Sequence, residues 1–253
     1  MKSLGVYKFS SCDGCQLAIL DAHEDLLKVF SRFDVRHFAE AGPIDEEAEV
    51  DVALIEGSVS TPEELKRIEA IRQKSKFLIA MGACATSGGI QALRNRADGL
   101  GWLSSLYGSP EPELLAISKP PSAHVRVDHL IWGCPVTTPE VLDALSCLAL
   151  GIVPRPQETP LCLECKKKGH VCVIVSRGAP CVGPTTRAGC QALCPGLERA
   201  CYGCTGPLPQ ANIPSLASRF GDDGLNEEEV KRRFVLIHGD TPQVQEVFPQ
   251  GGA

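Results

Sequence analysis

The first half of the chain alternates short apolar runs with segments that have helical periodicity. The runs Leu4–Phe9, Val50–Ile55, Phe77–Met81 and Leu130–Trp132 have the length and composition of strands. The second and third runs are almost wholly apolar, which is typical of parallel strands covered on both faces. This succession of strands, loops and helices predicts an α/β fold with a flavodoxin-like, doubly wound parallel sheet.

Helices are predicted between the strands from periodicity and from start signals. Leucines recur at helical spacing from about Cys15 to Phe30, which predicts one helix there. The sequence Thr61-Pro62-Glu63-Glu64 has an N-cap residue, a proline at the first helical position and acid in the first turn. A further helix is predicted from Thr138 to about Leu150.

The character of the sequence changes near residues 151–160, where three prolines mark a linker. We therefore predict one domain over residues 1–153 and a smaller, irregular domain over residues 154–253. Between Cys162 and Cys204 there are eight cysteines and little periodicity. Such a segment is expected to lack a conventional core and to need metal to fold. No role is predicted for the C-terminal tail.

Composition narrows the class of protein. The 253 residues are 43% hydrophobic and 22% charged, with a net charge of −6, which is ordinary for a globular protein and speaks against nucleic acid as a partner. No stretch approaches the roughly 20 apolar residues that span a bilayer, and no secretory signal is recognisable. We therefore expect a cytoplasmic protein.

The cysteine count departs from the ordinary. Thirteen cysteines are present, an odd number that cannot pair completely within one chain. The cytosol keeps thiols reduced, so a disulfide framework is not expected. Ligation of metal by thiolates is the better interpretation.

Four cysteines of the first domain follow predicted strands: Cys12, Cys15, Cys84 and Cys134. The carboxyl ends of parallel strands meet at one edge of a sheet. The sequence therefore predicts one metal site built from three distant segments.

The eight cysteines of the second domain divide by chain order into two groups, each with a C-x-x-C pair. They are Cys162, Cys165, Cys172 and Cys181, then Cys190, Cys194, Cys201 and Cys204. This spacing suits two iron–sulfur clusters or two structural zinc sites. The N-terminal site made of distant loops favours iron, as do the glycines beside the cysteines, because they free backbone N–H groups for cluster sulfurs. Seven basic and three acidic residues between Arg155 and Cys204 would offset anionic clusters, although Lys166–Lys168 also suits a solvated turn.

Two other residues are singled out. Glu56 ends a buried strand and could support the cluster loop, relay protons, or only cap the turn at Ser58–Thr61. Cys147 is left over at an apolar helix position and is expected to be a buried small side chain. The sequence contains no phosphate-binding glycine motif and no other arrangement typical of a substrate-turnover site.

With these motifs, the chain resembles the small (delta) subunit of cytoplasmic, NAD(P)-linked [NiFe]-hydrogenases of the sulfhydrogenase type. The resemblance extends to about Pro207 and is most specific in the cysteine-rich half. The matching segments are Ser11–Leu17, Ile55–Ser60, Gly82–Ala85, Gly133–Pro135, Cys162–Cys165, Gly183–Cys190, Cys194-Pro195 and Cys201–Cys204.

The resemblance implies an electron-relay subunit with three [4Fe–4S] clusters and no turnover site of its own. The proximal cluster would be held by Cys12, Cys15, Cys84 and Cys134, the distal one by the group that begins at Cys162, and the medial one by the group that begins at Cys190. Cys162 stands where the periplasmic branch has histidine. Cys194 stands where that branch has proline and a [3Fe–4S] cluster.

The resemblance also implies partners. A large catalytic subunit would hold nickel and iron, and iron–sulfur and flavin/NAD(P)-binding diaphorase-like subunits would hold FAD and NAD(P). Two alternatives remain open. One is a small subunit of an F420-linked or heterodisulfide-reductase-linked hydrogenase, and the other is a zinc-stabilised structural subunit.

Overall fold

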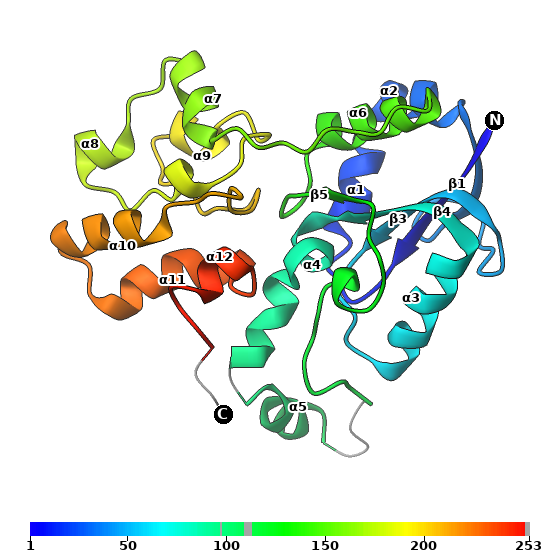
Figure 1. The fold of residues 1–253 in the computed structure, drawn as a ribbon, viewed down its shortest axis with the longest axis horizontal. Helices are drawn as coiled ribbons and strands as arrows, with labels where there is room; N and C mark the ends of the chain where they lie inside the picture. The colour runs from blue at the N-terminus through cyan, green and yellow to red at the C-terminus, as the bar shows by residue number, and fades with distance from the viewer. Residues whose placement is uncertain (97, 109–112, 251–253) are drawn as a thin grey trace. The chain divides into compact units, whose positions relative to one another are not determined.

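The computed structural model describes residues 1–96, 98–108 and 113–250 (Figure 1). The chain divides into two compact units, Met1–Pro156 and Gln157–Ala253. The assignment of one cluster to the first unit and two to the second remains a prediction. Among the described residues, no helix combines the length and the apolar character needed to cross a bilayer.

The first unit is built on a parallel sheet. Its strands are β1 (Lys2–Lys8), β2 (Phe33–Phe38), β3 (Val50–Glu56), β4 (Ser75–Met81) and β5 (His129–Ile131), in the spatial order β2-β1-β3-β4-β5. Every neighbouring pair is parallel. This is the flavodoxin-like strand order, so the predicted α/β fold class is confirmed.

Helices cover both faces of this sheet (Figure 1). Helices α1 (Gly14–Leu20), α2 (His23–Phe30) and α6 (Thr138–Ala149) supply the apolar side chains of one core. Helix α3 (Pro62–Lys74) supplies the other. The strands alternate between the two cores: Leu4, Val6, Val52, Leu54, Ile79 and Met81 point to the first, and Tyr7, Ala53, Ile55 and Leu78 to the second.

Two expectations about the first unit need correction. The predicted helix Cys15–Phe30 is two helices, because His23 has φ of 48°, a left-handed conformation that an α-helix does not continue through. Strand β2 was not predicted. It is an edge strand in which Asp34 and Arg36 are partly or fully exposed, so it lacks the continuous apolar run that marks the other strands.

The segment after β4 consists of helix α4 (Gly82–Ser87), a 3₁₀ helix at Gly89–Arg96 and helix α5 (Gly99–Tyr107), with a short 3₁₀ turn at Pro121–Ala123 before β5. Helix α3 begins with the predicted capping box, in which Thr61 and Glu64 bond each other's backbone N–H groups. The helix predicted from Thr138 is also present, as α6.

The second unit consists of short helices, turns and loops. Its helices are α7 (Leu161–Lys167), α8 (Val173–Arg177), a 3₁₀ turn (Gly183–Thr185), α9 (Leu193–Gly196), α10 (Ile213–Asp222), α11 (Glu227–His238) and α12 (Pro242–Gln245). The expectation that its cysteine-rich segment lacks a conventional core is wrong. Leu161, Val173 and Val182 pack in one core with Phe220 and Phe234 of the tail helices. The periodicity within the segment could not show this, because half of the core comes from residues that follow it.

Candidate iron–sulfur sites

The strand ends in the first unit lie in one row. Lys8 of β1 pairs with Glu56 of β3, Glu56 pairs with Met81 of β4, and Met81 pairs with Ile131 of β5. The four predicted ligands follow these strand ends: Cys12 lies in the loop after β1, Cys15 on α1, Cys84 on α4 and Cys134 in the loop after β5. Parallel pairing in this register is therefore what delivers separate chain segments to one edge.

Direct contacts join the three segments at that edge. Gly82 has φ of +88°, and a Cβ atom built on it would lie 2.3 Å from the Cys15 Sγ atom. The Ala83 N–H donates to the Gly133 carbonyl at 2.6 Å. The loop after β1 thus contacts the loop after β4, which in turn is bonded to the loop after β5.

Burial and neighbouring thiols raise the pKa values of three cysteines at this edge. Burial raises the pKa of Cys15 strongly, and the Glu56 carboxylate and the Cys84 and Cys134 thiols add to the effect. Burial raises the pKa of Cys84 to about 11, with further contributions from Cys134 and Cys12. Burial followed by the Cys12 thiol raises the pKa of Cys134. The structure therefore brings Cys12, Cys15, Cys84 and Cys134 together.

Backbone N–H groups oppose these shifts. The Val136 amide donates to the Cys15 sulfur and the Gln91 amide to the Cys84 sulfur, and each bond lowers the pKa of the thiol that accepts it. Donors of this kind favour a thiolate and surround metal-bound cysteine in proteins.

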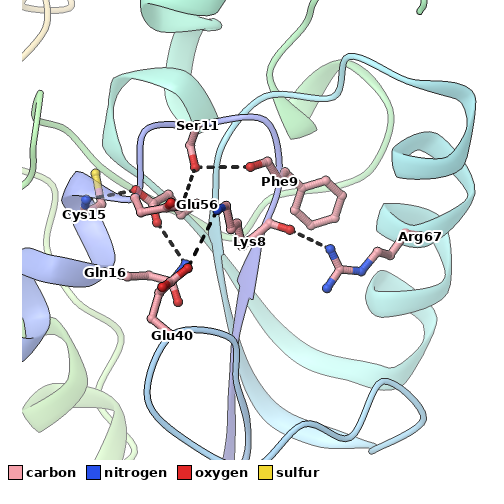
Figure 2. Close-up of polar contacts among 9 residues, drawn as sticks. Lys8, Phe9, Ser11, Cys15, Gln16, Glu40, Glu56 and Arg67 are labelled. Carbon is pink, nitrogen blue, oxygen red and sulfur yellow. Dashed lines mark hydrogen bonds and ion pairs between the residues drawn. The ribbon is translucent and has the colours of Figure 1, made fainter. Parts of the chain in front are cut away.

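Glu56 binds the first turn of α1. Its side chain is 2% exposed. Its Oε1 atom accepts from the Cys15 backbone N–H at 2.9 Å, and its Oε2 atom accepts from the Gln16 side-chain amide at 3.0 Å (Figure 2). Burial raises the pKa of Glu56, while these two hydrogen bonds lower it. Glu56 thus contacts the backbone of a predicted ligand. Its support of a cluster and its proton-relay role both stay predictions.

The alternative role considered for Glu56, as a cap of the following turn, is wrong. Glu64 accepts from the Ser60 N–H at 2.7 Å and from the Thr61 N–H at 3.2 Å. It also accepts from the Ser10 hydroxyl at 2.9 Å. The turn is thus capped by a residue of α3, whereas Glu56 accepts hydrogen bonds from Cys15 and Gln16.

Sequence reasoning missed four polar residues near Cys12 and Cys15. Gln16 is fully buried beside Glu56. The Lys8 ammonium lies 2.6 Å from the Asp13 carboxylate and 3.8 Å from the Glu40 carboxylate, and Figure 2 shows the second of these contacts. Asp13 has φ of 65° in the turn between two predicted ligands. The dipeptide Asp13-Gly14 was the available signal, because it is typical of a turn with left-handed backbone.

In the second unit the first group of thiols also comes together. Cys162 and Cys165 lie on α7, Cys172 precedes α8, and Cys181 lies in the loop that follows. Burial raises the pKa of Cys162 to about 11, with contributions from Cys181, Cys165 and Cys172. The pKa of Cys165 is raised by burial and then by Cys181 and Cys172.

The second group behaves in the same way. Burial raises the pKa of Cys194, and the Cys190 thiol adds to it. Burial raises the pKa of Cys201 strongly, and Cys181, Cys204 and Cys190 add to it. Cys181 belongs to the first group by chain order, so its influence on Cys201 means that the two groups adjoin.

Hydrogen bonds connect the two groups. The Cys201 backbone N–H donates to the Cys181 Sγ atom at 3.2 Å, and the Gly203 N–H donates to the Cys201 Sγ atom at 3.3 Å. The Glu164 carboxylate of α7 accepts from the Gly189 N–H at 3.0 Å, next to Cys190. Helix α7 is thereby tied to the loop that supplies the second group.

The thirteenth cysteine is placed differently from its prediction. Cys147 lies on α6 and is half-buried rather than buried. Across residues 1–96, 98–108 and 113–250, no three histidine, cysteine or carboxylate side chains are arranged to hold a single metal ion. A [4Fe–4S] core takes one thiolate at each of its irons, so its four sulfurs surround a cluster rather than one ion.

Comparison with protein families places this chain beside redox subunits. The family described as NADH ubiquinone oxidoreductase, 20 Kd subunit, matches residues 12–148, a stretch that contains all four cysteines of the first site.

Similarity to individual proteins extends over most of the chain. The sulfhydrogenase 2 subunit delta of Pyrococcus furiosus is 35% identical over 91% of this chain and 97% of its own length. A subunit of the F420-non-reducing vhu hydrogenase of Methanocaldococcus jannaschii is 31% identical over 93% of each chain. A crystal structure of an NAD⁺-reducing [NiFe]-hydrogenase in the H₂-reduced state matches with a TM-score of 0.57 and 28% identity, over 61% of this chain and 94% of that one.

The contact between Gly82 and Cys15 generates a first prediction. Gly82→Ala should displace the Cys15 sulfur, because no Cβ fits at 2.3 Å, and the left-handed backbone adds strain. We expect anaerobically purified protein to lose the iron and sulfide of one site, about 4 of each. Gly151→Ala is the matched control, since Gly151 also has positive φ but only the Lys2 Nζ atom at 4.0 Å. Equal loss in both variants would mean that strain, not the sulfur contact, is responsible.

The carboxyl of Glu56 generates a second prediction. Glu56→Ala leaves two buried donors unpaired, at a cost of about 1–3 kcal/mol each in the free energy of unfolding. Glu56→Gln should cost far less. It keeps an acceptor for the Cys15 N–H, and a flip of the Gln16 amide would turn the Gln16 Oε1 atom, which has no hydrogen-bond partner, toward the new donor. Denaturant unfolding of both variants measures the difference, and equal destabilisation would contradict this account.

Proposed function

Since the chain belongs to the family of the NADH ubiquinone oxidoreductase 20 kDa subunit, and within it to the small subunits of [NiFe]-hydrogenases, we propose that it relays electrons through three [4Fe–4S] clusters. The proximal cluster is assigned to Cys12, Cys15, Cys84 and Cys134, the distal to Cys162, Cys165, Cys172 and Cys181, and the medial to Cys190, Cys194, Cys201 and Cys204. The observation that supports this most is the grouping of the thiols. In each set, burial and then other thiols of the same set raise the pKa of at least one cysteine: Cys84, Cys162 and Cys201 are the examples.

The donor chemistry fits such clusters. Crowded, buried thiols resist ionisation on their own, and a cationic iron–sulfur core removes that cost by taking the thiolates as ligands. Backbone N–H groups already point at the sulfurs of Cys84, Cys181 and Cys201. When bound, clusters of this kind accept and donate single electrons at potentials set by hydrogen bonds, charge and solvent exposure.

The order of the two clusters in the second unit is supported by burial. Cys181 and Cys201, whose hydrogen bond joins the two groups, are both buried. Cys172, on the other side of the distal group, is exposed. We therefore assign the medial cluster to the interior of this unit. Electrons would leave the distal cluster for an acceptor at the surface around Cys172.

Charge within the second unit suits anionic cofactors. Lys166, Lys167 and Lys168 are exposed, as expected of a solvated turn. Arg187, in contrast, is 8% exposed, and its guanidinium donates to the Gln157 carbonyl at 2.6 Å. A buried cation is unfavourable unless negative charge lies nearby, and thiolate-bound clusters would supply that charge.

Partners follow from the proposed relay. A large catalytic subunit would hold the nickel–iron site, and flavin/NAD(P)-binding and further iron–sulfur subunits would complete the path in an NAD(P)-linked complex. The similarity to a subunit of an F420-non-reducing hydrogenase favours a second candidate, with the same role for this chain but a different electron acceptor. Reduced thiols suit the cytoplasm. Co-purification of the native complex identifies the acceptor subunits.

Metal analysis is the first test of this proposal. Twelve ligands in three groups of four should retain about 12 iron and 12 acid-labile sulfide per chain after anaerobic purification. The alternative of two structural zinc sites requires about 2 zinc per chain for the eight cysteines of the second unit. Stoichiometric zinc with little sulfide would overturn the assignment of clusters.

The path is tested by removing single ligands in the assembled complex. Cys172→Ser should depress hydrogen-driven NAD(P) reduction at least tenfold, yet spare hydrogen–deuterium exchange, because it affects only the exit. Cys84→Ser should impair hydrogen-linked reduction of every acceptor, since the first site is shared by all routes. Cys147→Ser is the control, as it removes a half-buried thiol outside the three groups.

Only variants that still co-purify with the large subunit are compared, because a lost ligand can unfold its unit. Full NAD(P) reduction by a Cys172→Ser complex would exclude the linear relay.

A further inference from the structure

One histidine of the C-terminal tail is buried against a predicted ligand loop. His238 is the last residue of α11 and is 3% exposed. Its Nε2 atom lies 2.9 Å from the carbonyl oxygen of Cys204. A carbonyl only accepts, so Nε2 bears the hydrogen and donates.

The ring donates as a neutral group. Burial lowers the pKa of His238 to about 4, with Arg187 lowering it further and the hydrogen bond to Cys204 opposing the shift. The neutral ring therefore has its hydrogen on Nε2, which faces the Cys204 carbonyl.

The tail fixes the position of this ring. The His238 carbonyl accepts from the Thr241 hydroxyl at 2.8 Å and from the Thr241 N–H at 3.1 Å, which closes the turn into α12. One turn earlier, the Phe234 ring stacks on Phe220 at 6.0 Å and on Phe248 at 5.5 Å between ring centroids. These contacts belong to the core that also contains Cys181 and Cys201, so the tail and the ligand loops form one packed body.

The loop that His238 contacts is a tight turn. The Gly206 N–H donates to the Gly203 carbonyl at 3.0 Å, and the Gly203 N–H donates to the Cys201 sulfur at 3.3 Å. The Thr205 hydroxyl donates to the Arg187 carbonyl at 2.5 Å. The side chain of Thr205, which follows Cys204, is thus hydrogen-bonded to the Arg187 carbonyl, and the Cys204 carbonyl is hydrogen-bonded to His238.

We propose that His238 is a positioning residue for Cys204, and that through it the tail helices α10–α12 retain the cluster bound by Cys190, Cys194, Cys201 and Cys204. The inference rests on the proposed function in that it takes these cysteines as cluster ligands. In this role His238 acts on the backbone of Cys204 and not as a ligand. It orients the backbone from which one thiolate projects, as outer hydrogen bonds orient metal ligands generally.

The choice of variants follows from the space around the ring. A cavity of about 20 Å³, room for one water molecule, is lined by Tyr202, Gly203 and His238. A small replacement would admit water that could donate in place of the ring, so His238→Leu is the better test because it fills the space without a donor. His238→Gln restores an N–H at a similar reach.

The matched control is Val230→Ala, at a buried position of the same helix and the same core that lies away from the Cys204 hydrogen bond. The full chain is purified anaerobically, and its iron, sulfide and zinc are counted alongside EPR spectra of the reduced clusters. We expect His238→Leu to lose about 4 of 12 iron and sulfide and the signal of one cluster, while the Gln and Val230→Ala variants keep all three.

Retention of every cluster in His238→Leu would overturn the proposal. Equal loss in Val230→Ala would also overturn it, because the effect would then be one of core packing, and so would failure of His238→Gln to restore the missing cluster. Failure of the proposed function is distinguished by the wild type itself: zinc without sulfide would reject the clusters, and the same three variants compared for zinc would still test whether His238 positions Cys204.

Discussion

Thiols held close together in a buried place resist ionisation, and this electrostatic constraint shapes both units of the protein. Burial is the largest cause of the raised pKa values of Cys15, Cys84, Cys162 and Cys201, and neighbouring thiols add to it in each case. A metal-free group of four thiolates is therefore unfavourable, whereas thiolates around a cationic core are not. Backbone amides directed at the sulfurs lower part of the cost, and the positive φ of Gly82 and Gly203 lets the backbone approach that closely.

The first unit meets this constraint with a scaffold that has its own core. Helices pack on both faces of the sheet, and Cys15 of α1 belongs to one of the two cores. The pairing of Lys8, Glu56, Met81 and Ile131 sets where the ligand-bearing segments begin. Glu56 then has two opposite effects. It accepts from the Cys15 N–H and so orders the loop, but its charge raises the pKa of the Cys15 thiol.

The second unit meets the same constraint with ligands that are part of the core. Cys181 and Cys201 pack with Phe220 and Phe234 from the tail helices, and the Cys201 amide donates to the Cys181 sulfur. Ligand geometry and core packing are therefore coupled in this unit. Loss of a cluster should therefore also affect the packing of the tail, because the ligands Cys181 and Cys201 belong to the same core.

The sequence by itself determined most of the strands and helices of the first unit and the division of the cysteines into groups. Apolar runs such as Val50–Ile55, the cap at Thr61 and the cysteines placed after strands depend on short-range periodicity and on the geometry of parallel strands, and these predicted the sheet and the shared edge. Only the tertiary structure decided which distant polar groups meet. Glu56 accepts from the N–H of Cys15, 41 residues earlier in the chain, yet it is a single acid at the end of a strand. His238 reaches Cys204 from beyond the cysteine-rich segment. Such contacts depend on how helices and loops pack, and no spacing along the chain encodes that packing.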